Sequence, residues 1–524
     1  MRRVVKNART WWWVGLAAVY VGWAVARWLW VPGLEFDEAE QMLHLQRLRP
    51  SYGPQPPLFE WSLWALHTLT GGPALLVLAL LKAALFVMIA VGVAHAARQA
   101  CGDGGMGAPL GWWALTLAPL LWDAPRTLTH SLLATACIAV LVALSMPLIV
   151  APDRAVSRRR WGLIGLVAAA ALLAKYNAVL VLAGWSVTAM TAWWLDGRSW
   201  TRWRERVVRH SRGLPWALLG LLPFGLHVAW VWGQRSQVID PIRAKMQAPT
   251  GGGGGVLLAF AEAWLATVGT AVLVAVVAVV VSGRRQRGVV LTAKGGGVGG
   301  GAATATSSFW LALLLGYMAA VVVAVAVLSL SAGLSDIKLR WVMPMAVPAV
   351  VLGGVALLRA RPAAATVLRR VSAAVVVASL VLLVWRPTLL AQQGRASWSQ
   401  LSPAAVARRL DAIGAGGAVV IADPIHLAGA LAIQRAADMV VYPGSSRLAI
   451  DADRPVCAFW WVGTQPITSF ADPESPTVYR VSAPNTMRWH AHTDGRAPGV
   501  LYAQAVTAAN GPCPTLGQVY DRLP

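Results

Sequence analysis

The chain has 524 residues, of which 57% are hydrophobic and only 13% are charged, and its formal net charge is +23. Soluble domains carry about 25% charged residues, so this composition excludes an ordinary soluble protein and indicates a membrane protein with several spans. The positive charge does not indicate nucleic-acid binding, because the basic residues fall in short clusters between apolar segments, as the positive-inside rule describes.

A helix that crosses a bilayer needs about 20 apolar residues, and eleven segments of the chain meet or approach this length. They are residues 11–31, 74–97, 109–123, 129–150, 161–174, 178–195, 214–233, 257–282, 308–332, 341–358 and 371–388. The first lacks a small-residue cleavage site, so we expect a retained helix. Residues 251–255 and 294–305 are low in complexity and are predicted to be loops.

The distribution of Lys and Arg predicts an orientation. If the N-terminus is cytoplasmic, the cytoplasmic loops hold more than twice as many basic residues as the opposite loops, Arg158 to Arg160 among them. The charge distribution therefore predicts a multi-pass membrane protein with a cytoplasmic N-terminus and an extracytoplasmic C-terminal part. In a bacterium the membrane would be the cytoplasmic (inner) membrane, and the C-terminal part would be periplasmic.

After residue 388 the composition changes, and polar residues alternate with short apolar runs bounded by Gly, Pro or Asp. The runs 418–422, 439–442, 458–462, 478–481 and 500–503 predict strands, and residues 403–413 and 427–437 have helical spacing. We therefore expect two domains, a transmembrane domain over residues 1–388 and a small α/β domain over residues 389–524. Cys457 and Cys513 both lie in the second domain and could pair in an oxidising compartment.

Acidic residues are concentrated after the first predicted span, where Glu35, Asp37, Glu38 and Glu40 fall within six positions of a chain with only 22 acids. A carboxylate at the membrane rim can act as a general base if burial gives it a useful pKa. Adjacent helical residues point about 100° apart, so only one of Asp37 and Glu38 would be the base. The alternative is that these acids interact with the N-terminal dipole of a helix.

The motif order FDEAE…YGPQPPLFEW resembles the family of multi-span glycosyltransferases with the GT-C fold, which includes bacterial aminoarabinose transferases and protein mannosyltransferases. Three later stretches support the resemblance: DAPRTLTHSLLATA at 123–136, ALLAKYNAVL at 171–180 and DIKLRWVMPMAVP at 336–348. The resemblance covers about the first 390 residues. The fold class that it implies is a GT-C-like α-helical membrane protein with about 11 transmembrane helices and a small extracytoplasmic α/β domain.

The resemblance also implies an activity, the inverting transfer of a sugar from a polyprenyl-phosphate carrier to an extracytoplasmic lipid, glycan or protein. Asp37 matches the acid that serves as base, and Glu38 would support it. The phosphate that leaves gains negative charge in the transition state and needs cations. Gln55 stands where the family commonly has a phosphate-holding Lys. The other substrate-binding candidates are Arg126, His130, Lys175, Tyr176, Asn177, Lys338 and Arg340.

These candidates also have ordinary structural explanations, since the cations could pair with lipid headgroups and His130 could be a hydrogen-bonded structural residue. No cofactor is expected with certainty, although Asp37, Glu38 and Asp123 could gather around a divalent cation. The expected partners are a polyprenyl-phosphate-sugar donor, the acceptor and membrane lipids, but not nucleic acid. Two other functions stay open: a transporter or flippase of lipid-linked glycans, and a non-catalytic scaffold that displays the outer domain.

Overall fold

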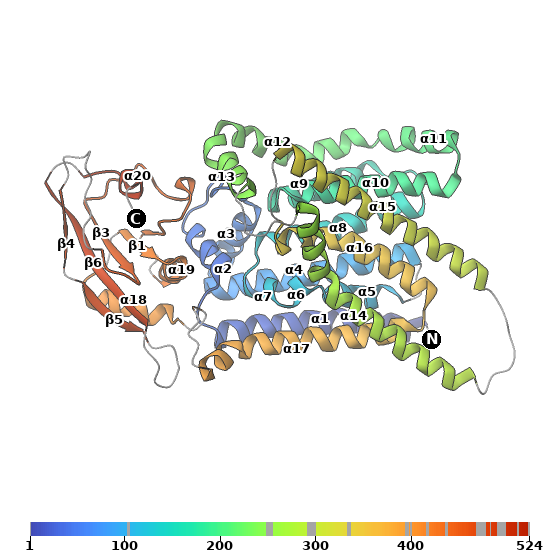
Figure 1. Ribbon diagram of the computed structural model, residues 1–524, viewed down its shortest axis with the longest axis horizontal. Helices are drawn as coiled ribbons and strands as arrows, with labels where there is room; N and C mark the ends of the chain where they lie inside the picture. Colours follow the sequence, from blue (N-terminus) through green and yellow to red (C-terminus); the bar gives the residue numbers. More distant parts are fainter. Residues whose placement is uncertain are drawn as a thin grey trace. The chain divides into compact units, whose positions relative to one another are not determined.

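The computed structural model in Figure 1 describes residues 2–101, 105–247, 255–290, 300–332, 337–393, 398, 401–415, 419–434, 439–467, 478–482, 484–489, 499–510 and 513–521. For some residues in these ranges only the backbone is described. The chain divides into two compact units. The first unit comprises residues 1–21, 82–125 and 130–380, and the second comprises residues 22–81, 126–129 and 381–524.

The first unit is built from helices that are apolar over most of their length. They are α1 (Arg2–Trp30) up to Val21, α4 (Ala74–Cys101) from Lys82, α5 (Gly107–Ala114), α6 (Ala118–Leu121), α7 (Asp123–Arg126) up to Pro125, α8 (His130–Val150), α9 (Arg158–Ala174), α10 (Ala178–Gly197), α11 (Trp200–Ser211), α12 (Leu214–Gly233), α13 (Arg235–Gln247), α14 (Val256–Val290), α15 (Gly300–Ala332), α16 (Leu339–Ala360) and α17 (Ala364–Gln392) up to Leu380.

Eight helices in the described part of the chain are long and apolar enough to cross a membrane: α4, α8, α10, α12, α14, α15, α16 and α17. They confirm the predicted multi-span helical protein, although the predicted number of spans is only approximate. The third predicted span, 109–123, is wrong as a single helix, because it is broken into α5, α6 and α7. Pro119 lies in the first turn of α6, where proline is tolerated because a helix begins there, but it cannot continue a preceding helix.

The two predicted low-complexity loops fall largely outside the described residues. Residues 251–254 and 294–299 are in this group. The described α15 already begins at Gly300, so the second predicted loop, 294–305, extends too far. The sequence misplaced this boundary because its small and polar residues give no apolar periodicity.

Two buried indole groups of the first unit have hydrogen-bond partners inside the protein, which suits an environment without water. Trp113 donates its indole N–H to the carbonyl oxygen of Ala271 at 2.7 Å. Trp185 donates to the hydroxyl of Ser145 at 2.7 Å. These bonds tie together helices that are far apart in the sequence.

The second unit joins the segment after α1 to the C-terminal α/β region. Besides the ends of α1, α4, α7 and α17, it contains α2 (Phe36–His44), α3 (Leu58–Thr70), α18 (Pro403–Ala412), β1 (Val419–Asp423), α19 (Ile425–Gln434), β2 (Met439–Val441), the 3₁₀ helix Arg447–Ala449, β3 (Ala458–Gly463), β4 (Val478–Val481), β5 (Asn485–Trp489), β6 (Gly499–Asn510) and α20 (Leu516–Tyr520). The predicted boundary at residue 388 stays a prediction.

One mixed sheet organises the C-terminal region, in the order β2-β1-β3-β6-β4, with β5 also paired to β6. β1 pairs in parallel with β2 and β3, whereas β6 is antiparallel to β3, β4 and β5. Figure 1 shows α18, α19 and α20 beside this sheet. Five of its strands and two of its helices lie where the apolar runs predicted them, and the predicted small α/β region is confirmed.

A disulfide joins Cys457 and Cys513, whose Cα atoms are 4.6 Å apart. The pairing that the sequence left open is therefore present in the structure. The bond links the residue before β3 to the segment between β6 and α20.

Candidate active site

Helix α2 carries the predicted base, and its acidic N-terminus explains where it begins. Glu35 is the N-cap residue in extended conformation, and Glu35 and Glu38 form a reciprocal capping box. The backbone N–H of Glu35 donates to Oε2 of Glu38 at 3.3 Å. A capping box satisfies backbone groups that a helix end otherwise leaves without partners, and acids in the first turn also interact favourably with the helix dipole.

Glu38 is buried and forms an ion pair with Arg27 of α1. Nη2 of Arg27 lies 2.8 Å from Oε2 of Glu38, and the two side chains are only 8% and 3% exposed. The same guanidinium donates to the carbonyl oxygens of Val31 and Gly33. Glu38 therefore fixes the turn between α1 and α2, and these contacts favour a positioning role. Its predicted part in catalysis stays a prediction.

Glu35 is contacted by two guanidinium groups within the second unit. Nη2 of Arg126 lies 3.2 Å and Nη1 of Arg386 lies 3.0 Å from the same oxygen, Oε1. The three side chains are 22%, 21% and 24% exposed, in that order, so an incoming anion can reach them. Planar guanidinium groups are well suited to phosphate or carboxylate oxygens.

Asp37 lies in the first turn of α2, two residues after Glu35, and is partly exposed. Its neighbour Glu38 is 2% exposed. The different burial of the two side chains agrees with the expectation that they point in different directions. Asp37 is thus the acid of this pair that solvent or a substrate can approach.

His426 of α19 adds a further titratable group to the second unit. Its ring stacks on Trp398, with ring centroids 5.4 Å apart, and contacts Phe36 edge-on at 6.2 Å. Burial lowers the pKa of His426, because it disfavours the imidazolium, and the negative charge of Glu35 opposes this effect. The buried Nδ1 atom of His426 has no hydrogen-bond partner among the described residues.

Gln55 is partly buried in the bend that precedes α3. Behind this bend, Glu60 of α3 is 3% exposed and lies 3.3 Å from Nδ1 of His44. Tyr52 stacks on His44 at 4.6 Å, and burial raises the pKa of Tyr52 to about 12. The Pro-Pro segment therefore covers a buried polar cluster, and Gln55 stays a substrate-binding prediction.

The remaining predicted residues belong to the first unit, apart from Arg126. The amine of Lys175, which is 7% exposed, donates to the hydroxyl of Ser131 and to the carbonyl oxygen of Arg340, the latter at 3.4 Å. Asn177 donates to the carbonyl oxygen of Trp341 at 2.9 Å. The structure thus brings together the two stretches that contain Lys175 and Arg340, whose roles in substrate binding stay predictions.

Three more predicted residues of the first unit have distinct environments. The hydroxyl of Tyr176 lies 2.9 Å from Nε2 of His227, and burial raises the pKa of Tyr176 to about 12. His130 is 5% exposed at the start of α8. Lys338 is exposed and precedes α16. Lys338 is therefore the least enclosed of the predicted cations, and Lys175 is the most enclosed.

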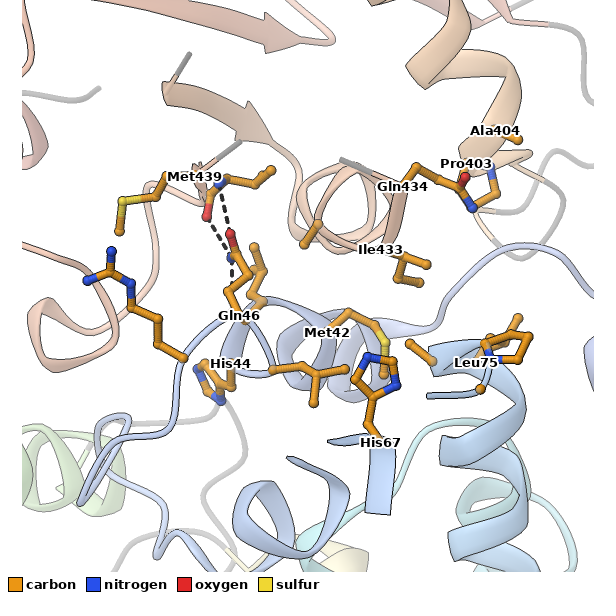
Figure 2. Close-up of a pocket in the computed structure, with 18 of the residues that line it drawn as sticks. Met42, His44, Gln46, His67, Leu75, Pro403, Ala404, Ile433, Gln434 and Met439 are labelled. Carbon is orange, nitrogen blue, oxygen red and sulfur yellow. Dashed lines mark hydrogen bonds between the residues drawn. The ribbon is translucent and has the colours of Figure 1, made fainter. Parts of the chain in front are cut away.

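The second unit also contains a cavity of about 900 Å³, part of which is shown in Figure 2. Its polar residues are His44, Gln46, Arg47, His67, Ser402, Gln434 and Arg454, and its apolar residues include Trp28, Met42, Leu75, Pro403 and Ile433. Gln46 makes two hydrogen bonds of 3.0 Å with the backbone of Val440, so it holds the end of α2 against strand β2.

The cations of this cavity are not equally neutralised. Arg47 pairs with Asp451 at 2.7 Å. Arg454 has no carboxylate partner among the described residues, and its Nη1 contacts only the sulfur of Met439, at 3.8 Å. The cavity is therefore a compartment with mixed polar and apolar walls, and it contains an arginine that an anionic group could contact.

Metal ligands were also considered for the predicted site. Among the described residues, no three His, Cys, Asp or Glu side chains are grouped so that they could hold a metal ion. The predicted grouping of Asp37, Glu38 and Asp123 around a divalent cation is not found among these residues.

Fold and site together define a multi-span membrane protein with an acidic helix, α2, after the N-terminal helix α1 and a small α/β region after α17. Two solved structures of ArnT from Cupriavidus metallidurans share this fold. The apo structure matches with a TM-score of 0.53 at 14% identity, and the structure bound to undecaprenyl phosphate matches with 0.56 at 13%. Each match covers 95% of this chain and 98% of ArnT, and the predicted GT-C-like fold is confirmed.

In sequence, the chain is similar to the lipopolysaccharide core galacturonosyltransferase RgtA from Rhizobium johnstonii, with 31% identity over 273 residues. The match covers 49% of this chain and 50% of RgtA, so the chain spans about half the length of the curated relative that it matches. No protein-family model matches the chain.

Sequence reasoning missed three residues that organise the second unit: Arg27, Arg386 and His426. Both arginines were hidden inside predicted spans, at 11–31 and 371–388. A cation near the end of an otherwise apolar span is unusual enough to indicate a function, so the sequence alone could have identified both arginines. His426 gave no comparable signal, because its position depends on how α19 packs.

Proposed function

We propose that the protein is an inverting membrane glycosyltransferase that takes a sugar from a polyprenyl-phosphate carrier. The observation that supports this most strongly is the combination, within one compact unit, of a partly exposed Asp37 with the Arg126–Glu35–Arg386 cluster. The fold shared with a protein that binds undecaprenyl phosphate and the similarity to a galacturonosyltransferase agree with it. A transporter or a scaffold gives this combination no role.

The proposed reaction is a single displacement at the anomeric carbon of the sugar. The oxygen of an acceptor hydroxyl forms a bond to that carbon while the bond to the phosphate oxygen breaks, and the carboxylate of Asp37 takes the proton of the hydroxyl. The departing polyprenyl phosphate keeps the electron pair, and Arg126 and Arg386 are proposed to stabilise its charge. Preformed donors of this kind act on charge that develops in the transition state.

We propose that the active side faces the extracytoplasmic compartment. The excess of basic residues in the loops assigned to the cytoplasm supports this orientation, and the Cys457–Cys513 disulfide supports an oxidising environment for the α/β region. The bacterial inner membrane is the location that fits both features. The 900 Å³ cavity, with Arg454 on its wall, is the proposed place for part of the acceptor.

The donor and acceptor can be identified before the mechanism is tested. Mass spectrometry of envelope lipids and glycans, with and without the gene, should show one glycan that lacks a single sugar in the deletion strain. A galacturonosyl polyprenyl phosphate and a lipopolysaccharide core are the first pair to try, because the matched relative acts on a lipopolysaccharide core. An unchanged envelope would contradict the proposed transfer.

The role of Asp37 is then tested with purified protein in liposomes that contain the identified donor. Asp37→Asn should lower the transfer rate by about 100-fold or more, as expected for loss of a general base. Glu40→Gln is the matched control, because Glu40 is another partly exposed acid of α2, and it should stay within about threefold of the wild type. Wild-type transfer by Asp37→Asn would rule out the base.

A further inference from the structure

A groove lies along α9 and α12 in the first unit, away from the residues considered so far. It has a volume of about 440 Å³. Arg158 and Arg159 line one end, and Leu166, Leu219 and Pro223 line the rest. The groove therefore combines a cationic end with apolar walls.

Close packing of small residues creates this groove. A side chain on Gly220 would collide with the backbone of Gly162 and Leu166, and one on Gly165 would collide with Ala217. Small residues at a crossing let two helices in a membrane approach closely, as Figure 1 shows for α9 beside α12. The surface of Gly162 stays open, since a Cβ atom there would meet only the carbonyl oxygen of Trp216, at 3.8 Å.

Among the described residues neither Arg158 nor Arg159 has a carboxylate partner. Arg158 lies over the ring of Trp216, with its guanidinium carbon 5.6 Å from the ring centroid. Asp153, the preceding acid in the sequence, is already engaged by Arg206 and Arg209.

These arginines also occupy the unfavourable end of α9, because the N-terminus of a helix carries partial positive charge. The third arginine of the run differs, since Arg160 donates to the carbonyl oxygen of Leu144 and to Gln99. An anion at Arg158 and Arg159 would relieve the repulsion between these arginines and the N-terminus of α9.

The walls of the groove indicate that such an anion carries an acyl chain. α12 is one of the candidate membrane spans, and only 17% of its 18-residue apolar stretch is buried within the protein. Leu219 is 61% exposed and Leu166 is 48% exposed, so both would face hydrocarbon in a bilayer. Trp216 lies between the cationic end and these leucines, and tryptophan favours the membrane interface.

We propose that this groove binds one anionic phospholipid, with its phosphate at Arg158 and Arg159 and one acyl chain along Leu166, Leu219 and Pro223. Basic pockets between helices at a membrane surface are suited to anionic headgroups. The lipid would also cover the exposed face of the α9–α12 crossing and hold the two helices together. This proposal does not depend on the proposed sugar transfer.

The test uses the full-length protein in detergent, with phosphatidylglycerol or phosphatidylcholine added and bound lipid counted by native mass spectrometry. The wild type should retain one phosphatidylglycerol in preference to phosphatidylcholine. Arg158→Gln/Arg159→Gln should weaken this retention about 10- to 30-fold, from the loss of two charges near a headgroup. Arg202→Gln/Arg204→Gln removes the same charge from exposed residues of α11 and should stay within about threefold of the wild type.

A second variant tests the acyl chain separately. Gly162→Leu places a side chain in the groove, and its Cβ atom makes only an ordinary contact of 3.8 Å with the carbonyl oxygen of Trp216. It should weaken phosphatidylglycerol retention, while inorganic phosphate at millimolar concentration should not displace the lipid. If the arginine variants fail to fold, Gly162→Leu still tests whether the groove holds the lipid. Equal retention of both lipids by the wild type would overturn the proposal, as would displacement by phosphate together with normal retention by Gly162→Leu.

Discussion

The buried ion pair between Arg27 and Glu38 leads to a prediction that separates positioning from catalysis. Glu38→Gln keeps the shape of the side chain but leaves the Arg27 guanidinium, which is 8% exposed, without its counter-charge. Removing one partner of a buried pair costs about 3–5 kcal/mol of folding free energy, mainly because the other charge stays buried and uncompensated. The same change at Asp37, which is partly exposed, should cost less than about 1 kcal/mol.

The double variant Arg27→Leu/Glu38→Leu removes both charges and should be more stable than either single variant. Apolar residues of similar volume often replace a buried pair with little loss. Some loss is expected here, because Arg27 also donates to the carbonyl oxygens of Val31 and Gly33, and each buried acceptor that loses its donor costs about 1–3 kcal/mol. The double variant should therefore lie between the wild type and the single variants.

Thermal unfolding, followed by tryptophan fluorescence in detergent, measures this order of stability. The expected order of midpoints is wild type and Asp37→Asn highest, the double variant next, and Glu38→Gln lowest. A wild-type midpoint for Glu38→Gln would refute the reasoning about the buried pair. A folded double variant that transfers sugar at the wild-type rate would exclude direct catalysis by Glu38.

Two further predictions concern α19. The lowered pKa of His426 means that its neutral form is favoured in the folded state, so its contribution to stability is present above pH of about 6.5 and is lost as the pH falls below that value. The thermal midpoint should fall between pH 7 and 5, and less steeply in His426→Gln; parallel slopes would contradict this. Gly429→Ala places a Cβ atom 2.6 Å from Cα of Ala39, so it should displace α2 and lower the rate of sugar transfer at least about tenfold. Gly269→Ala, in open space on α14, is the control and should leave the rate unchanged. Equal transfer rates for the two variants would be inconsistent with this packing.

The sheet was predictable because its signal is local. The strands β1, β3 and β4 are short apolar runs with turn residues on both sides, and each run was enough to indicate a strand. Strand β5, Asn485–Trp489, was missed because its sequence NTMRW has no apolar run, and its place depends on pairing with β6. The register with a distant strand decides such a segment, and a single sequence does not contain that information in local form.

The candidate site was predictable only in part, for the same reason. Asp37 stood out because acids are rare in this chain. The cluster around Glu35 did not, because its partners Arg126 and Arg386 lie 91 and 351 residues away along the chain. Composition identifies an unusual residue, whereas the partner that gives it a role is fixed by the packing of helices.

The contacts of α2 connect the proposed base to the α/β region. Gly429 of α19 allows close approach to Ala39, and Gln46 pairs with the backbone of Val440 in β2, so both the middle and the end of α2 rest on that region. Glu38 fixes the first turn of the same helix to Arg27. The direction of Asp37 is therefore set by the α/β region as well as by the membrane helices. An acceptor bound in the cavity next to Gln46 would act on the same helix that carries the base, which gives the α/β region a physical means to couple acceptor binding to transfer.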